Sequence, residues 1–153
     1  MSYKKIKGDL IKDALDGDFD AIVHGCNCFN TMGAGIARTI RMNFPDAYEE
    51  DCKTKCGDKD KLGTYSSIAC DVYNMKKVTI INAYTQYHYW GGHNADYDAI
   101  EKVFKLINSN FKGKTIGIPR IGAGLAGGDW KKIKKSIKKA CTDVNIIYVK
   151  YDQ

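Results

Sequence analysis

The sequence predicts an α/β sandwich around a mixed, mostly parallel sheet, with residues 1–153 forming a single domain. Segments typical of strands alternate with segments typical of helices, which favours parallel strands joined by helical crossovers. The strand segments are short continuous apolar runs, as expected where both faces of a sheet are covered. A chain of 153 residues is long enough for one ordinary domain and too short for two.

The first half of the chain is predicted to supply three of the strands. Its apolar run Ala21-Ile22-Val23 is typical of a buried strand, and Pro45 fits the first turn of a helix. The expected elements are, in order, a strand over residues 3–7, a short helical segment after Gly8-Asp9-Leu10, a strand over residues 21–24, helices over residues 36–43 and 45–55, and a strand over residues 64–70 after a turn at residues 57–63.

The second half begins with the strongest strand pattern in the sequence, the apolar run at residues 78–83. Two amphipathic helices are then indicated by apolar residues at helical spacing. The expected elements are a strand over residues 78–83, a helix from Tyr97 to Ile107, a strand over residues 115–118, a helix over residues 130–140 and a closing strand over residues 146–149. Ligands of such sheets bind beyond the carboxyl ends of the strands, so the loops that follow strands are the candidate site.

Composition and charge exclude several classes of protein. No apolar stretch approaches the roughly 20 residues of a membrane helix, and the N-terminus lacks the apolar segment of a secretory signal. We therefore expect a soluble, cytoplasmic protein. The cysteine pairs Cys26/Cys28 and Cys52/Cys56 lack zinc-knuckle spacing, so reduced thiols are expected, with no bound metal and no cofactor.

A run of lysines accounts for the net charge of the chain. The chain carries +6, and residues 131–139 alone contain six lysines and no acidic residue. Trp130, Ile133 and Ile137 recur at helical spacing, so the lysines fall on the outward arc of an amphipathic helix. A solvated helix face is the favoured interpretation. The alternative is an electrostatic patch for nucleic acid.

Glycines gather in three predicted loops that follow strands. Eight of the fifteen lie there: Gly33, Gly35, Gly91, Gly92, Gly122, Gly124, Gly127 and Gly128. The first and last of these loops open directly into helices. Glycine allows backbone N–H groups to surround an anion, and a helix N-terminus adds unpaired donors. The two loops therefore suggest a clamp on phosphate, although tight turning between strand and helix would explain each loop alone.

Four motifs in order give the chain a resemblance to macro domains. The motifs are Gly8-Asp9-Leu10, AIVHGCN at residues 21–27, MGAGIA at residues 32–37 and IPRIGAGLAGG at residues 118–128. The match spans essentially the whole chain and is closest to small stand-alone macro domains described as ADP-ribose 1″-phosphate phosphatases and ADP-ribosyl-glutamate hydrolases. The resemblance implies a three-layer α/β/α sandwich.

The resemblance also implies roles for individual residues. Asp9 would accept a hydrogen bond from the adenine amino group, or alternatively cap a helix. Asn27 would bind the distal ribose, or alternatively satisfy loop backbone, and the aromatic residues Tyr84, Tyr87, Tyr89 and Trp90 could cover a ribose or base. The implied ligand-binding residues are Gly8, Asp9, Leu10, Asn27, Gly33, Ala34, Gly35, Ile36, Ala37, Pro119, Ile121, Gly122, Ala123, Gly124, Leu125, Ala126 and Gly127.

The chain departs from two catalytic patterns of the family. Macro domains with an aspartate in the first glycine loop would carry it where this chain has Ala37, and ADP-ribosyl-glutamate hydrolases would carry one where it has Ala126. No counterpart of the nucleophilic lysine of those hydrolases is identifiable in residues 87–94. The nearest acid, Asp129, precedes the lysine-rich helix and is first of all an N-cap candidate.

Histidines and one asparagine remain as candidates for catalysis. His88 and His93 lie in the aromatic loop that is expected to border the distal ribose, where an imidazole could act as a general acid or base. His24 is expected in a buried, hydrogen-bonded structural role. The catalytic candidates are therefore Asn27, His88, His93 and Asp129.

These observations predict a macro domain that binds ADP-ribose and hydrolyses a small derivative, either the 1″-phosphate or an ADP-ribosyl ester. One alternative is a module that binds ADP-ribose, a signalling nucleotide or an ADP-ribosylated protein without turnover, which the two missing aspartates favour. A second alternative is a nucleic-acid-associated module that uses the lysine helix at residues 131–139. No membrane partner is expected.

Overall fold

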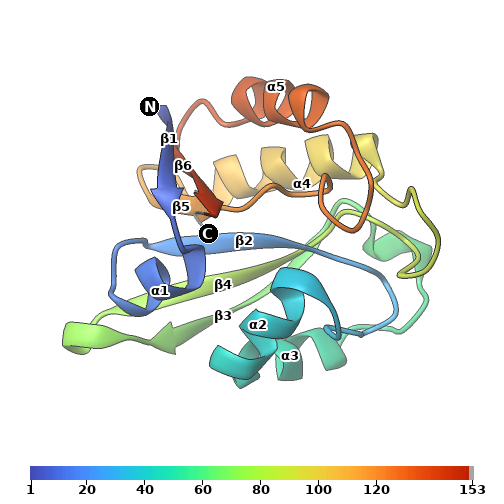
Figure 1. The fold of residues 1–153 in the computed structure, drawn as a ribbon, viewed down its shortest axis with the longest axis horizontal. Coiled ribbons are helices and arrows are strands. Elements are labelled where there is room, and N and C mark those ends of the chain that lie inside the picture. Colours follow the sequence, from blue (N-terminus) through green and yellow to red (C-terminus); the bar gives the residue numbers. More distant parts are fainter. Residues whose placement is uncertain (152–153) are drawn as a thin grey trace.

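The computed structural model describes residues 1–151 and contains a six-stranded sheet with helices on both faces (Figure 1). The strands are β1 (Tyr3–Gly8), β2 (Ala21–Cys26), β3 (Tyr65–Asp71), β4 (Lys77–Tyr84), β5 (Thr115–Ile118) and β6 (Asn145–Tyr151). The α-helices are α1 (Leu10–Leu15), α2 (Gly35–Asn43), α3 (Pro45–Cys52), α4 (Tyr97–Asn110) and α5 (Trp130–Ala140), and single 3₁₀ turns cover Lys59–Lys61 and Tyr73–Met75.

The sheet is mostly parallel, as the sequence predicts. Its strand order is β1-β6-β5-β2-β4-β3, and the pairing of β3 with β4 is the antiparallel one. The other five strands run in the same direction, so their carboxyl ends meet at one edge of the sheet. The segments that follow β1, β2, β4 and β5 therefore lie near one another although they are far apart in the sequence.

Alternating side chains of the strands pack into two separate hydrophobic cores, one on each face of the sheet. In β2, Ala21 and Val23 pack with residues of α4 and α5, whereas Ile22 packs with residues of α1 and α2. Figure 1 shows the resulting layers, with α4 and α5 above the sheet and α1, α2 and α3 below it. This arrangement confirms the α/β/α sandwich and explains why the strand sequences are continuous apolar runs.

The predicted elements are all present, with differences at their ends. The helix expected over residues 45–55 ends at Cys52. Lys53 and Thr54 donate backbone hydrogen bonds to residues three positions back, and the Thr54 hydroxyl donates to the Asp51 carbonyl at 2.6 Å, so the last turn closes early. The strand expected over residues 21–24 continues to Cys26, which carries it to the edge where the candidate site lies.

Helix α5 presents its lysines to solvent, as its periodicity predicts. Ile133 and Ile137 are buried, and none of the three ion pairs found in residues 1–151 includes a lysine of α5. Across this part of the chain, no helix has the length and apolar character that crossing a membrane requires.

Candidate functional site

A cleft of about 980 Å³ lies at the carboxyl edge of the parallel strands. Such a volume falls within the range of typical ligand sites. The cleft brings together residues from four loops and the end of β6, and it includes most of the residues that the family resemblance implies. Those of the implied set that line it are Asp9, Leu10, Asn27, Gly33, Ala34, Gly35, Ile36, Ala37, Pro119, Ile121, Gly122, Gly124, Leu125 and Ala126, whereas Gly8, Ala123 and Gly127 do not.

The N-terminus of α2 opens into the cleft without a side-chain cap. Ala34 occupies the cap position and has no side-chain acceptor, whereas α1, α4 and α5 are each capped by an aspartate side chain. The first backbone N–H groups of α2 are consequently left without acceptors in residues 1–151. Because these donors and the helix dipole both favour negative charge, this end of α2 is suited to an anion.

The second glycine loop presents further unpaired donors to the cleft. Its shape is fixed by hydrogen bonds from Gly127 N to Gly124 O at 3.1 Å and from Gly128 N to Gly122 O at 2.7 Å. The N–H groups of Gly122 and of residues 124–126 have no acceptor in the described chain. The two loops meet where Leu125 lies over Gly35, since a Cβ on Gly35 would be 3.1 Å from Leu125 Cδ1.

Asp9 lies in the cleft and also caps α1. Its Oδ1 accepts backbone hydrogen bonds from Ile11 at 3.1 Å and Lys12 at 3.2 Å. Its Oδ2 accepts no hydrogen bond in residues 1–151. The two roles considered from the sequence are therefore compatible, because one oxygen serves the helix and the other is free to accept from a ligand.

Asn27 lines the cleft, but its side chain is largely engaged within its own loop. Its Nδ2 donates to the Thr31 hydroxyl at 2.7 Å and to the Thr31 carbonyl at 3.3 Å, and its Oδ1 accepts from Phe29 N at 2.8 Å. One acceptor position on Oδ1 remains for a ligand. Asn27 therefore holds the loop between β2 and α2 in shape in addition to facing the cleft.

Several residues of the cleft were not predicted from the sequence. Thr31 and Gln86 line it from loops, and Tyr148, Val149, Lys150 and Tyr151 line it from the end of β6. The four residues of β6 could have been predicted from the sequence. A closing strand of a mostly parallel sheet brings its carboxyl end to the same edge as the glycine loops.

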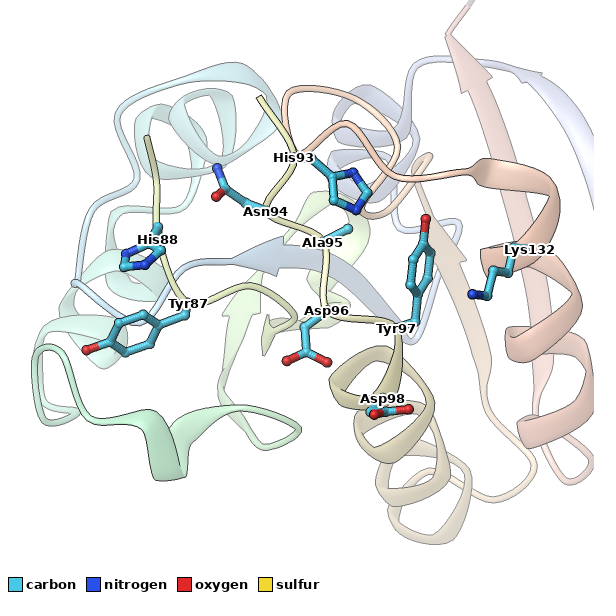
Figure 2. A pocket seen from close by; sticks show the side chains of 9 residues that line it. All are labelled: Tyr87, His88, His93, Asn94, Ala95, Asp96, Tyr97, Asp98 and Lys132. Atoms are coloured by element: carbon cyan, nitrogen blue, oxygen red, sulfur yellow. The ribbon is translucent and has the colours of Figure 1, made fainter. Parts of the chain in front are cut away.

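A second cavity of about 540 Å³ adjoins the cleft (Figure 2). Asn94 lines both spaces. The second cavity is lined by Tyr87, His88, His93, Asn94, Ala95, Asp96, Tyr97, Asp98 and Lys132. His88 and His93, which we expected to border the distal ribose, thus lie in this neighbouring space and not in the cleft itself.

His93 is held in one tautomer by the second glycine loop. Its Nδ1 lies 3.0 Å from the Gly127 carbonyl, and a carbonyl only accepts, so Nδ1 carries the proton and donates it. Nε2 is therefore the nitrogen available for chemistry. Beyond His93 lie Tyr97, with ring centroids 6.2 Å apart, and Lys132, whose Nζ is 4.1 Å from the Tyr97 ring centroid.

The aromatic residues at the end of β4 and in the loop after it fall into two environments. Tyr89 lines the cleft, whereas Trp90 is 52% exposed, and its ring centroid lies 4.2 Å from that of His88. Tyr84 is different: it is 1% exposed, and its hydroxyl donates to buried Asp51 at 2.7 Å. The expectation that Tyr84 covers a ribose or base is therefore wrong, because the polar end of this residue is held inside the protein.

His24 has the buried structural role that we expected. It is completely buried, and its Nε2 lies 2.6 Å from Asn82 Oδ1. Burial lowers the pKa of His24 to about 4, since the charged imidazolium would lose its hydration. Cys26, whose Sγ lies 3.6 Å from His24, reaches the cleft, but burial raises the pKa of its thiol well above the usual value, which disfavours a reactive thiolate.

Asp129 caps α5, as its position predicts. Its side chain accepts a hydrogen bond from Lys131 N at 3.0 Å, and it lines neither the cleft nor the second cavity. All six cysteines lie in the described part of the chain, and none is paired in a disulfide there.

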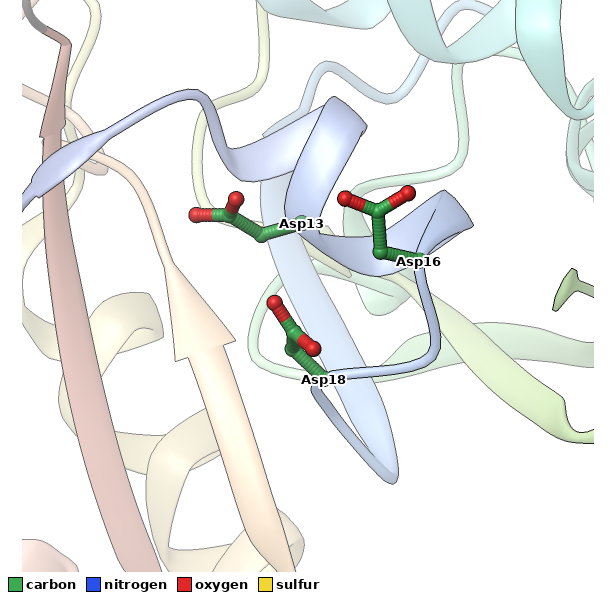
Figure 3. A group of neighbouring side chains, drawn as sticks. All are labelled: Asp13, Asp16 and Asp18. Atoms are coloured by element: carbon green, nitrogen blue, oxygen red, sulfur yellow. The ribbon is translucent and has the colours of Figure 1, made fainter. Parts of the chain in front are cut away.

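A cluster of three aspartates lies on and after α1 (Figure 3). Among the described residues, Asp13, Asp16 and Asp18 form the one group whose ligand atoms are mutually close enough to hold a metal ion. Burial and the neighbouring carboxylates raise the pKa of Asp13. Exposed acidic groups of this kind are common, and nothing else in the structure marks the cluster as a binding site.

Comparison with known proteins identifies the family. The family profile described as Macro domain matches residues 23–137, which is well over half of the chain. The chain therefore belongs to the macro domain family.

Individual relatives agree with this assignment. A protein of phage T4, described as an uncharacterized 17.5 kDa protein in the tk-vs intergenic region, is 36% identical, with 99% of this chain and 98% of the relative covered. An ADP-ribose 1″-phosphate phosphatase of Candida albicans is 26% identical over 88% of this chain and 90% of its own length. A DNA ADP-ribosyl glycohydrolase of Mycobacterium tuberculosis is 27% identical over 84% of this chain, which spans only 36% of that protein.

A solved structure shows the same fold. The macrodomain of Mycobacterium tuberculosis DarG superposes with a TM-score of 0.69 at 25% identity, covering 99% of this chain and 97% of that one.

Proposed function

We propose that the cleft binds ADP-ribose and that the chain hydrolyses a derivative of it at the distal ribose. The observation that carries the proposal is the presence of two sets of backbone N–H groups without an acceptor in residues 1–151, one at the uncapped start of α2 and the other at Gly122 and residues 124–126, on residues that line one cleft. Two adjacent anion sites of this kind suit a diphosphate.

The ends of the cleft support one orientation of the ligand. The free oxygen of Asp9 offers an acceptor for an adenine amino group, and Asn27 directly follows β2, which β6 and β5 separate from β1 and Asp9. The distal ribose would then lie near Asn27 and Asn94, next to the second cavity. A group attached to its 1″ oxygen would point toward that cavity.

The chemistry proposed for the 1″-phosphate uses one water and one proton donor. Water attacks phosphorus, the bond between phosphorus and the 1″ oxygen breaks, and the departing oxygen takes a proton, which yields ADP-ribose and inorganic phosphate. His93 in its protonated form is the candidate donor through Nε2, since Nδ1 is held by Gly127. The phosphatase named among the relatives supports this reaction class.

Calorimetry with ADP-ribose tests the binding half of the proposal, with AMP and ribose 5-phosphate as controls. We expect micromolar affinity for ADP-ribose, about −8 kcal/mol or weaker, and much weaker binding of either fragment. Release of phosphate from ADP-ribose 1″-phosphate tests the chemistry, with a chelator present throughout. Binding of ADP-ribose without release of phosphate would reject the proposed hydrolysis and support a non-catalytic binding module. Absence of ADP-ribose binding would reject the whole proposal.

A second candidate is that the group on the distal ribose belongs to a nucleic acid. The six lysines of α5 form no ion pairs in residues 1–151, and Lys132 lines the second cavity together with aromatic rings and two carboxylates. Rings can stack on a base, carboxylates can accept from its amino group, and lysines can contact phosphates. The glycohydrolase named among the relatives is consistent with this candidate.

Salt dependence separates the second candidate from the first. Binding of a single-stranded oligonucleotide should weaken steeply as salt rises, and replacing Lys131 and Lys135 by Gln should lower that slope by about 0.7 for each of the two lysines that neutralises a phosphate. An equal double replacement at Lys112 and Lys114, on the turn before β5, is the control for net charge. If neither double variant changes the slope of binding affinity against salt concentration, the lysine face of α5 is excluded as the nucleic-acid surface.

A further inference from the structure

A row of three cationic residues lies at or just beyond the carboxyl ends of the neighbouring strands β1, β6 and β5. Lys7 of β1 pairs in register with Lys150 of β6, and Arg120 follows β5, whose last residue, Ile118, pairs with Tyr148 of β6. Figure 1 shows the three strands next to one another at this end of the sheet. Residues in register on parallel strands project from the same face, which brings the Lys7 and Lys150 side chains together.

This row has no acidic counterpart among the described residues. Lys7, Arg120 and Lys150 are all exposed, and none of them forms an ion pair in residues 1–151. Like charges directly opposite on neighbouring strands are destabilising. The pairing of β3 with β4 shows the usual solution, since Asp71 lies opposite Lys77 and their charged atoms are 2.9 Å apart. The cationic row therefore lacks the compensation that the protein provides at another position of the same sheet.

Two members of the row, Arg120 and Lys150, line the cleft. Lys150 lies on the side of Asp9, because β1, which ends in Gly8 directly before Asp9, is the neighbour of β6, and Arg120 follows β5, the neighbour of β6 on its other side. The diphosphate is already accounted for by the backbone donors of the two glycine loops, so these side chains are left to meet a different part of the ligand. The nearest part in the proposed orientation is the adenosine ribose.

We propose that the cleft prefers ligands that carry a phosphomonoester on the adenosine ribose, bound by Arg120 and Lys150 with support from Lys7. This inference rests on the proposed binding of ADP-ribose and adds the chemical class of its adenosine half. A guanidinium group offers two parallel donors to phosphate oxygens, and the lysines add point charges.

Calorimetry with matched nucleotides tests the preference directly. The probes are AMP, adenosine 2′,5′-bisphosphate and adenosine 3′,5′-bisphosphate, together with ADP-ribose and ADP-ribose 2′-phosphate. We expect at least one bisphosphate to bind tenfold or more tightly than AMP. The better of the two bisphosphates identifies the ribose position that the cations meet, and ADP-ribose 2′-phosphate should exceed ADP-ribose by a similar factor if that position is 2′.

A pair of charge-matched double variants assigns the preference to residues. Arg120→Gln with Lys150→Gln should reduce the affinity ratio between bisphosphate and AMP to about one. Lys112→Gln with Lys114→Gln also removes two positive charges, but before β5 at the opposite edge of the sheet. This control should keep the affinity ratio between bisphosphate and AMP.

The outcomes separate this inference from the proposed function. Equal affinity of the parent protein for AMP and both bisphosphates overturns the preference, as does a ratio that falls equally in both double variants. Failure of ADP-ribose to bind, with a bisphosphate preference that is lost only in the first double variant, rejects the proposed function and supports the cationic subsite.

Discussion

The cleft and the second cavity share the loop between β4 and α4, yet they present different chemistry to a ligand. The cleft is lined by glycine and alanine residues of two loops, and several of their backbone N–H groups have no acceptor in residues 1–151. The second cavity is lined by the side chains of two histidines, two tyrosines, two aspartates and a lysine. Backbone donors survive most substitutions, whereas side chains do not. The chemistry of the cleft therefore depends less on side-chain identity than the chemistry of the second cavity does.

The largest expected effect comes from placing a carboxylate among the backbone donors of the cleft. Gly124→Glu should lower ADP-ribose affinity more than a hundredfold, because the side chain brings bulk and negative charge to the phosphate position. A Cβ at Gly124 meets no atom within 4 Å, and its φ is not positive, so the variant should fold. Calorimetry on protein with a parent-like melting temperature makes the measurement.

Gly92→Glu is the matched control for this variant. Gly92 also has open space at its Cβ and lies outside the cleft. Affinity that is preserved in Gly124→Glu, or lost equally in both variants, would contradict a backbone clamp on the diphosphate.

Turnover distinguishes a residue that positions the ligand from one that caps a helix. Asn27→Ala should slow phosphate release from ADP-ribose 1″-phosphate by about a hundredfold, or ~2.7 kcal/mol in the barrier. Asp129→Ala should slow it much less, since Asp129 caps α5 and lines neither space. The activity should persist in EDTA. A variant at Asp129 that binds ligand but has lost turnover would reverse these two roles.

Asp9 lines the cleft and also caps α1, and its roles in ligand binding and in stability can be measured separately. Asp9→Ala should weaken ADP-ribose by about 1.5–3 kcal/mol and reduce the preference for adenine over hypoxanthine, which lacks the amino donor. It should also cost about 1 kcal/mol of stability through loss of the cap on α1. Asp129→Ala loses a comparable cap on α5 and should retain adenine preference. Unchanged base preference in Asp9→Ala would leave only the capping role.

The smallest effect concerns His24, which is buried away from the second cavity that holds the other two histidines. Its pKa is about 4 in the folded protein and near 6.5 when unfolded, so unfolding takes up a proton between these values. Stability should therefore fall as pH decreases through this window, by about 2 kcal/mol from pH 7 to pH 5. Chemical denaturation of the parent and of His24→Asn at both pH values measures it.

Asp51 acts in the opposite direction, because burial raises the pKa of its carboxyl group. The contribution of Asp51 is present in the parent and in His24→Asn, so it cancels when the stabilities of the two proteins are compared. An equal loss of stability in the parent and in His24→Asn would contradict the assignment to His24.

Local patterns made much of the fold predictable. Continuous apolar runs such as residues 78–83 indicate strands covered on both faces, and the spacing of Trp130, Ile133 and Ile137 gives the lysine helix its orientation. Helix ends were less predictable, since α3 ends where Thr54 bonds back to Asp51, and a side-chain contact of this kind leaves no periodic signal.

The glycine loops were identifiable because their chemistry lies in the backbone and needs only glycine and alanine. The second cavity was not, because its walls come from residues 87–98 and from Lys132, which are far apart in the sequence and are brought together by the packing of α4 on α5. Tyr84 was misassigned for a related reason: its partner Asp51 is 33 residues away in the sequence.

The carbonyl of Ala126 accepts hydrogen bonds from Asn94 N at 2.8 Å and Ala95 N at 3.3 Å. The backbone of the cleft is therefore bonded directly to the backbone of the second cavity, and these are the two compartments of the site. A Cβ at the neighbouring Gly127 would meet the Gly92 carbonyl, which leaves little freedom between the two loops. Any ligand that orders one compartment therefore orders part of the other, and the effect must be reciprocal. We expect products to leave in sequence: departure of the group from the second cavity loosens the loops, and ADP-ribose dissociates faster afterwards than before.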